Sequence, residues 1–348
     1  MIIKKLWLNN FRSYSTFEVE FSDGLTALIG KNGVGKTNLV ESLAYLSTLR
    51  SFRNSPTDSL IKKGSNSAVI RAEGIRDDRE VLIEVEIAKG RSKVLVNKQK
   101  LKKNRDLLGA LRVSVFSPDD LSLIKEGPSL RRDYLDDLAV AVDPANDVLL
   151  QNFAKVLKQR NALLKQAKFN NENLLSSLDV WDQRLGQFGD QLLALRMSLV
   201  KDLLPFIKHG YQKLSESAEE IEIDYIPSWN GFLIEALEAK RDDDLRRTVT
   251  TVGPHRDDVA IRLNSLNART EASQGEQRTL ALALRLASHN MIEARIGEPP
   301  LLLLDDVLSE LDNERSVALL QTLPEGQTVI TSAIELPKEI VPDLFIRV

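Results

Sequence analysis

The stretch that decides the fold is Gly30-Lys31-Asn32-Gly33-Val34-Gly35-Lys36-Thr37, which reads G-x-x-x-x-G-K-T, the spacing of a phosphate-binding loop. The apolar, β-prone run Leu25–Ile29 precedes it, and the run 38–46, with leucines at helical spacing, follows it. The loop is therefore predicted to join a buried strand to the start of a helix, which is the setting that phosphate binding requires.

The residue types in this loop predict how a phosphate group would be held. Three glycines let the backbone turn its N–H groups inward, and the helix that begins near Lys36 adds its positive N-terminal end. Lys36 is expected to reach the β- and γ-phosphates, and Thr37 to offer its hydroxyl to Mg²⁺. We therefore predict that the chain binds a nucleoside triphosphate with Mg²⁺. The contacts expected from the loop and the helix start are Gly30, Lys31, Asn32, Gly33, Val34, Gly35, Lys36, Thr37 and Asn38.

Composition limits the remaining possibilities. The 348 residues suffice for about two domains, and 28% charged with 43% apolar residues is typical of a folded globular protein. The absence of cysteine excludes disulfides, thiolate nucleophiles and cysteine-based metal sites. A net charge of −3 means that any DNA binding must come from local basic patches. The N-terminus lacks the apolar core of a signal peptide, and no apolar run is long enough to span a membrane, so a cytoplasmic location is expected.

The periodicity of apolar residues predicts an α/β domain interrupted by helices. Residues 17–21 and 68–96 have strand patterns, the latter with a hairpin turn at 89–92, and they predict an antiparallel layer. Helical spacing dominates from 118 to 246, where apolar residues of 177–207 face those of 147–168 as a coiled-coil-like pair. After 247 we expect strands at 248–252, 258–263, 301–304, 328–331 and 344–348, and helices at 275–296 and 313–320. The predicted domains are therefore 1–117 with 247–348, and an inserted helical lobe at 118–246.

Two carboxylates end the run of leucines at 301–304. A strand of this kind suits the buried centre of a parallel sheet, and a carboxylate at its carboxyl end lies where open α/β sheets bind ligands. Asp305 is expected to hold Mg²⁺, directly or through water, and Asp306 to orient or deprotonate the attacking water. With Lys36 they form the predicted catalytic set. The alternative is an acidic helix start, since Asp is favoured there.

Two further motifs are ambiguous when they are considered locally. The segment Ser273-Gln274-Gly275-Glu276 opens the long helix at 275–296 and has the S-x-x-E spacing of a capping box. A helix N-terminus that contains a glycine could also hold a γ-phosphate, and nothing local decides between the two interpretations. Ser309–Asp312, just beyond the carboxylates, could equally be a loop that ends in an N-cap.

Two groups of lysines are candidate contacts for DNA phosphates. The alternative for each group is an ordinary solvated surface. They are Lys98, Lys100, Lys102 and Lys103, in a basic run that ends at Arg105, and Lys155, Lys158, Lys165 and Lys168, on one side of the helix at 147–168.

Taken together, these motifs resemble the ABC-type ATPase heads of the SMC/Rad50/RecF group, and most closely its RecF branch, a bacterial recombination and DNA-repair family. Gly30–Thr37 is similar to the Walker A motif, Ser273–Glu276 to the signature motif, and Asp305 with Asp306 to Walker B. The remaining similarities cover the opening strand and adenine-side loop at 8–14, which includes Arg12, a stretch of the helical lobe at 157–164, the turn at 253–258, and the D-loop at 309–312.

The resemblance implies a mechanism beyond the local interpretation. Two subunits would enclose two ATP molecules, with Walker A and B of one facing Ser273–Glu276 of the other, so that ATP drives formation of a homodimer. Arg12 is implied as a nucleotide contact. The dimer would grip DNA and hydrolysis would release it, at gaps and arrested replication forks, with RecR and RecO as mediator partners in loading RecA and in support of the SOS response.

Three departures from the wider ABC pattern predict slow, switch-like hydrolysis. Asp306 replaces the usual glutamate after the Walker B aspartate, Thr331-Ser332 stand where many relatives have a histidine, and no glutamine occurs around 115–119. Three alternatives remain: the ATPase subunit of a transporter, a small-molecule kinase, and an ATP-dependent clamp without useful hydrolysis. The 236 positions between Thr37 and Ser273 (273 − 37), and the helical insertion that they contain, argue against the transporter. The kinase leaves the motifs at 273–276 and 309–312 unexplained.

Overall fold

The computed structural model describes residues 1–167, 172–215 and 219–348. The chain divides into two compact units. The first comprises Met1–Asp120, His209–Ser217 and Ala281–Val348, and the second comprises Leu121–Lys208 and Ala218–Leu280. Residues 247–280, which the sequence assigned to the ATPase domain, thus group with the second unit; the domain boundaries themselves stay a prediction.

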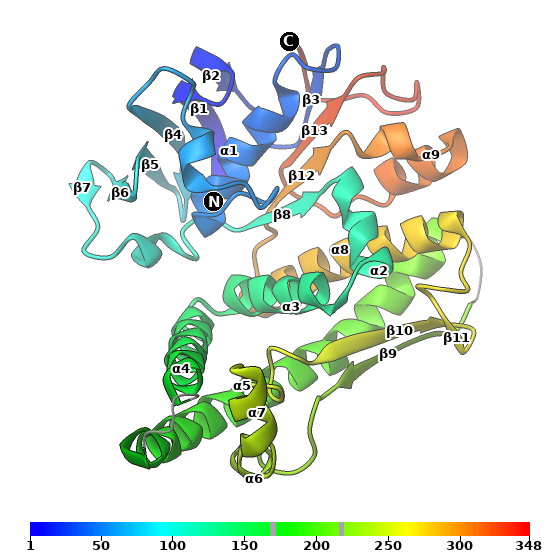
Figure 1. Cartoon of the computed structure of the whole chain (residues 1–348). Helices are drawn as coiled ribbons and strands as arrows, with labels where there is room; N and C mark the ends of the chain where they lie inside the picture. Colours follow the sequence, from blue (N-terminus) through cyan, green and yellow to red (C-terminus); the bar gives the residue numbers. More distant parts are fainter. Residues whose placement is uncertain (168–171, 216–218) are drawn as a thin grey trace. The chain divides into compact units, whose positions relative to one another are not determined.

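A five-stranded sheet forms the centre of the first unit, in the order β14-β3-β13-β12-β8 (Figure 1). Every residue of β12 and β13 is buried, which explains the leucine run, because a strand covered on both faces needs no polar alternation. All neighbouring pairs are parallel, so the carboxyl ends of the strands meet at one edge. The bounds are β3 Leu25–Ile29, β8 Val113–Phe116, β12 Leu301–Asp305, β13 Thr328–Ser332 and β14 Leu344–Arg347.

An antiparallel sheet forms a second layer of the same unit, in the order β2-β1-β4-β5-β6-β7. Ala88 pairs with Arg91, so Lys89 and Gly90 make the predicted hairpin turn, and Gly90 adopts a φ of 70° that glycine tolerates without strain. The predicted antiparallel layer is confirmed. The bounds are β1 Ile2–Phe11, β2 Tyr14–Glu20, β4 Ser67–Arg76, β5 Arg79–Ala88, β6 Arg91–Val96 and β7 Gln99–Lys100.

Helix α1 (Lys36–Thr48) is held in the core that these two sheets share. Its Leu39 and Leu43 belong to one buried apolar cluster with Ile70 of β4 and Leu303 of β12. The helix therefore has a fixed position relative to the sheet edge, and so has the loop that leads into it.

The second unit contains the predicted helix pair. Phe153 and Val156 of α4 share a buried apolar cluster with Leu185 and Leu192 of α5, which confirms the packing expected from their spacing. Helices α5 and α8 both begin in this unit and end in the first. The helices are α2 Ser122–Lys125, α3 Pro128–Val142, α4 Asn146–Ala167, α5 Glu172–Ser215, α6 Leu233–Ala239, α7 Arg241–Arg247 and α8 Gln274–Ile296, with α9 Asn313–Gln321 in the first unit. Within the described ranges, no helix combines the length and apolarity needed to cross a membrane.

The strand predicted at 248–252 is wrong, and the strands β8 and β9 were not predicted. Residues 248–252 form a loop because the backbone N–H groups of Thr250 and Thr251 donate to Asn161 Oδ1 (2.8 Å) and Asp244 Oδ1 (2.9 Å), not to a neighbouring strand. The strand predicted at 258–263 exists, but it belongs to a separate antiparallel sheet, β11-β10-β9, and not to the central one. Its members are β9 Ile221–Ile226, which the sequence pattern did not reveal, β10 Asp258–Leu263 and β11 Leu266–Asn267.

Candidate nucleotide-binding site

The phosphate loop joins β3 to α1, as predicted, and two of its glycines have a backbone that other residues rarely adopt. The φ angles are 87° at Gly33 and 114° at Gly35. A Cβ atom at Gly35 would also lie 2.8 Å from the Tyr14 hydroxyl, whereas one at Gly33 would meet nothing within 4 Å. Gly35 therefore satisfies both a conformational and a steric requirement.

Lys36 lies over this loop. Its side chain is buried, and Nζ donates to the backbone oxygens of Gly30 (2.7 Å) and Lys31 (3.1 Å). No side chain caps the start of α1, where Gly35 is the N-cap residue, so the first N–H groups of the helix are not satisfied by a cap. A cation, a glycine loop and an uncapped helix N-terminus together fit a phosphate group.

Asp305 lies at the carboxyl end of β12, almost wholly buried. Burial raises the pKa of its carboxyl, and hydrogen bonds from Thr331 and Thr37 oppose that rise. The Thr37 hydroxyl and the Asp305 carboxylate thus lie close together, and both are oxygen donors of the kind that Mg²⁺ prefers. These two residues fit a magnesium ion, which would stabilise the ionised carboxylate.

Asp306 follows in a strained conformation. Its φ and ψ are 51° and 27°, in the left-handed region, at the start of the 3₁₀ turn η4 (Val307–Glu310). Its Oδ1 is buried and, within the described residues, has no hydrogen-bond partner. An unsatisfied carboxylate oxygen beside Asp305 is suited to accepting a proton from water or to orienting one.

Arg12 and Asn38 are already bonded to the protein. The Arg12 guanidinium makes a bidentate ion pair with Glu41 of α1 (2.7 and 2.6 Å), and the Asn38 amide donates to Ser13 Oγ (2.9 Å). Glu41 is wholly buried, so Arg12 supplies the counter-charge that it requires. The turn between β1 and β2 is thus fixed to the first two turns of α1.

The capping box at Ser273–Glu276 is present. Ser273 N–H donates to Glu276 Oε2 (2.6 Å), and Glu276 N–H donates to Ser273 Oγ (3.3 Å). Hydrogen bonds to its carboxylate, first from the Ser273 hydroxyl and then from the Ser273 N–H, lower the pKa of Glu276. The structural interpretation of this motif is therefore confirmed, and its predicted phosphate contact stays a prediction.

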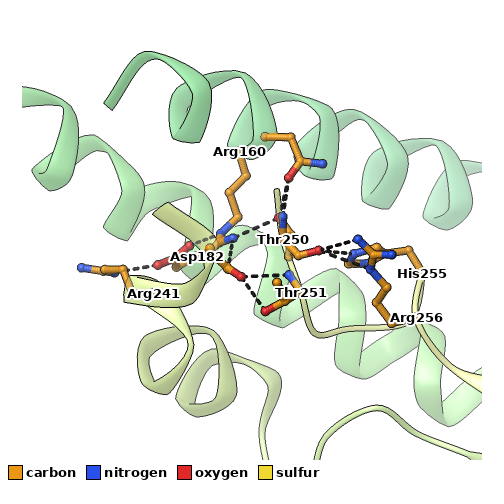
Figure 2. Close-up of polar contacts among 9 residues, drawn as sticks. Arg160, Asp182, Arg241, Thr250, Thr251, His255 and Arg256 are labelled. Carbon is orange, nitrogen blue, oxygen red and sulfur yellow. Dashed lines mark hydrogen bonds and ion pairs between the residues drawn. The ribbon is translucent and has the colours of Figure 1, made fainter. Parts of the chain in front are cut away.

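The turn at 253–258 is braced from within the second unit (Figure 2). Arg160 of α4 is wholly buried and pairs with Asp182 (2.5 Å) and Asp244 (2.6 Å), and it also donates to the Thr250 hydroxyl. The Thr250 carbonyl is 3.0 Å from Nε2 of His255, whose pKa is lowered to about 4 by burial. A neutral histidine held in this way has a structural role.

The candidate DNA contacts lie on exposed surface. Lys98, Lys100, Lys102 and Lys103 are exposed around β7 in the first unit, and Lys155, Lys158 and Lys165 are exposed on α4 in the second. Lys168 lies outside the described residues.

Three residues make contacts that the sequence pattern did not predict. Thr331 bonds both Asp305 and the backbone of Asp306. Burial raises the pKa of Asp305, and the charge of Arg53, an exposed residue after α1, is among the effects that oppose this rise. Glu41 is the third, since a glutamate in a helix is ordinarily solvated.

The segment around 115–119, where the wider ABC pattern has a glutamine, is followed by the buried Asp120. Its carboxylate pairs with Arg285 of α8 (2.7 Å).

Comparison with known proteins agrees with this geometry. The model of the RecF/RecN/SMC N-terminal domain matches residues 2–335, so the chain belongs to that family of ATPase heads. Within it, the chain belongs with the RecF proteins. It is 40% identical to the DNA replication and repair protein RecF of Streptomyces avermitilis, over 96% of this chain and 93% of that protein, and 38% identical to RecF of a Nocardioides species, over 96% and 94%.

Solved structures give the same result. The chain is similar to the recombination mediator protein RecF-ATP of the RecFOR pathway, with a TM-score of 0.91 and 33% identity over 99% of this chain and 95% of that one. An Smc head domain from Pyrococcus furiosus shares the fold, with a TM-score of 0.55 and 19% identity over 96% and 90%. The predicted fold class is confirmed, and the transporter and kinase alternatives lose their support.

Proposed function

We propose that this protein is an ATP-dependent DNA-binding protein of recombinational repair and replication-fork maintenance. The observation that carries the proposal is the convergence of Lys36, Thr37 and Asp305 at one sheet edge, in a chain so similar to an ATP-bound RecF. Lys36 would neutralise the β- and γ-phosphates, Thr37 and Asp305 would hold Mg²⁺, and Asp306 would orient the attacking water. Arg12 and Asn38 would complete the nucleotide contacts.

ATP would also join two copies of the chain. Ser273 and Gln274 are exposed at the start of α8, so they are accessible to a second subunit's nucleotide. The capping box uses the Ser273 oxygen as an acceptor, and the Ser273 hydroxyl also bonds the Glu276 carboxylate, so its proton would turn from that carboxylate to a γ-phosphate while the oxygen keeps its place in the cap. Capping and a phosphate contact in trans are therefore compatible.

The ATP-bound dimer would grip DNA through the exposed lysines of β7 and α4, and hydrolysis would release it. Its partners would be RecR- and RecO-type mediators, with the result that RecA is loaded at gaps and the SOS response is supported. The names of the similar proteins, DNA replication and repair protein RecF and RecFOR-pathway mediator, support this assignment. Such a protein would work in the cytoplasm, where bacterial DNA lies.

Hydrolysis would be weak and stimulated by DNA. Asp306 is one methylene shorter than the usual glutamate, and Thr331 and Ser332 are wholly buried where other ABC proteins have a histidine. Slow turnover would keep the protein in its ATP-bound state until hydrolysis ends it, as a switch requires. The alternative of a clamp without useful hydrolysis predicts a stable ATP dimer that produces no ADP.

The test is sedimentation and a DNA shift assay, each with and without ATP-Mg²⁺. In the wild type, ATP should raise both the dimer fraction and the affinity for DNA. Lys36→Ala should abolish both effects, because losing charged hydrogen bonds to phosphate weakens ATP binding by about 10- to 100-fold. Lys213→Ala, which removes an exposed lysine of α5, is the matched control. Identical wild-type traces with and without ATP would contradict the proposal.

A further inference from the structure

Thr331 lies beside Asp305 on the neighbouring strand of the central sheet. In the parallel pairing of β12 with β13, these two residues are direct partners in register. Thr331 is wholly buried. Its side chain is therefore part of the packed interior, at the edge where the strands end.

The Thr331 hydroxyl joins the two carboxylate residues. Its Oγ1 donates to Asp305 Oδ1 at 2.7 Å and accepts the N–H of Asp306 at 3.1 Å. That N–H is shared with the Thr331 backbone oxygen at 3.0 Å. Because the lone pair faces a donor, the hydroxyl proton is directed at Asp305, and the orientation of the group is fixed.

Each contact has a separate consequence. The bond to Oδ1 engages one carboxylate oxygen of Asp305 and restrains rotation of the group. The carboxylate is thereby held in place beside the Thr37 hydroxyl, the other proposed ligand of the ion. The bond from the Asp306 N–H secures a residue whose φ is 51°. This backbone conformation is costly for residues other than glycine.

We propose that Thr331 is a positioning residue for the magnesium site, acting through the Asp305 carboxylate and the backbone of Asp306. The inference rests on the proposed function, because it concerns the same site. Partners that orient a ligand without touching the metal typically alter metal affinity by roughly 10- to 100-fold when they are removed. The effect should therefore appear in magnesium dependence as well as in fold stability, because the buried Asp305 carboxylate loses a hydrogen-bond donor.

The chain offers a matched set of variants. Thr331→Val removes the hydroxyl and keeps the shape, and Thr331→Ser keeps the hydroxyl. Ser332→Ala also removes a buried hydroxyl from the end of β13. That hydroxyl accepts from Ile334 N–H (3.1 Å), whereas the Thr331 hydroxyl bonds Asp305 and Asp306. It is the control for loss of a buried hydroxyl as such.

The experiment measures binding of a fluorescent ATP analogue across a magnesium series and in EDTA. Thr331→Val should need about tenfold more Mg²⁺ for half-maximal binding, with unchanged binding in EDTA. The Mg²⁺ concentration that Thr331→Ser needs for half-maximal binding should stay within about twofold of the wild-type value. Ser332→Ala should match the wild type. Should the valine variant fail to fold, Thr331→Ala is measured against the same criteria.

The outcomes separate the two proposals. A wild type that binds no nucleotide at any magnesium concentration contradicts the proposed function itself. A wild type with normal magnesium dependence, and a Thr331→Val variant with the same curve, overturns the positioning role alone. Equal shifts in Thr331→Val and Ser332→Ala overturn it too, since they would indicate a general loss of packing.

Discussion

Helices α1 and α8 begin in opposite ways. The N-cap of α1 is Gly35, with no capping side chain, whereas Ser273 and Glu276 close a reciprocal capping box at the start of α8. Four N–H groups at a helix start need partners from outside the helix. At the start of α1 the Asn38 N–H donates to the Gly35 carbonyl (2.9 Å) and no side chain caps the rest, which suits a ligand. The start of α8 satisfies two of its N–H groups with the side chains of the capping box. An anion site can thus be built either by leaving a helix uncapped or by adding a ligand to an existing cap.

The largest effect expected from this comparison is at Gly35. Gly35→Ala should lower the free energy of unfolding by about 2–3 kcal/mol, because it combines an unfavourable positive φ with a clash against Tyr14. Gly33→Ala, in open space, should cost about 1 kcal/mol, from backbone strain alone. Urea unfolding followed by circular dichroism measures both values. Equal costs would mean that Tyr14 moves aside without penalty.

A smaller effect is expected at Ser273. Ser273→Ala should lower the free energy of unfolding by about 1 kcal/mol through loss of the cap, and it should weaken ATP-dependent dimer formation. Ser273→Asp keeps a capping oxygen but places a negative charge at the proposed phosphate contact. It should therefore retain stability and still lose the ATP dimer in sedimentation. A Ser273→Asp protein that dimerises normally would show that the segment only caps the helix.

The smallest effect concerns the charge of Glu276. Its folded pKa lies below the ordinary value of 4.5, so the charge stabilises the fold above that pH, and the benefit disappears as the pH falls through the folded pKa. Glu276→Gln keeps the capping hydrogen bond without the charge. The difference in melting temperature between wild type and variant should be present at pH 6 and should shrink as the pH falls below 4.5. A difference that grows as the pH falls would contradict this sign.

Local patterns were enough for features contained in one short stretch. The phosphate loop, the buried strand ending in Asp305 and the capping box each occupy eight or fewer consecutive residues. Their spacing predicts the geometry directly, because the strand and helix repeats place residues that are close in sequence at fixed distances in space. The same periodicity located the helix pair of α4 and α5.

Contacts between distant segments could not be predicted in this way. Residues 248–252 have the composition of a strand, yet Thr250 bonds Asn161, 89 positions away, and the segment becomes a loop. Glu41 is an ordinary helical glutamate until Arg12, 29 positions away, supplies its buried partner. In both cases the burial of polar groups selected the structure, and burial is a property of the packed chain.

The sequence by itself determined that a phosphate loop precedes α1, that carboxylates end a buried strand and that a capping box opens α8, because each signal is local. Only the tertiary structure decided that Thr331 bonds Asp305, 26 positions away, and that Arg12 pairs with Glu41. Those contacts depend on which strands lie side by side and which charges are withdrawn from water. Neither is encoded in the spacing of neighbouring residues.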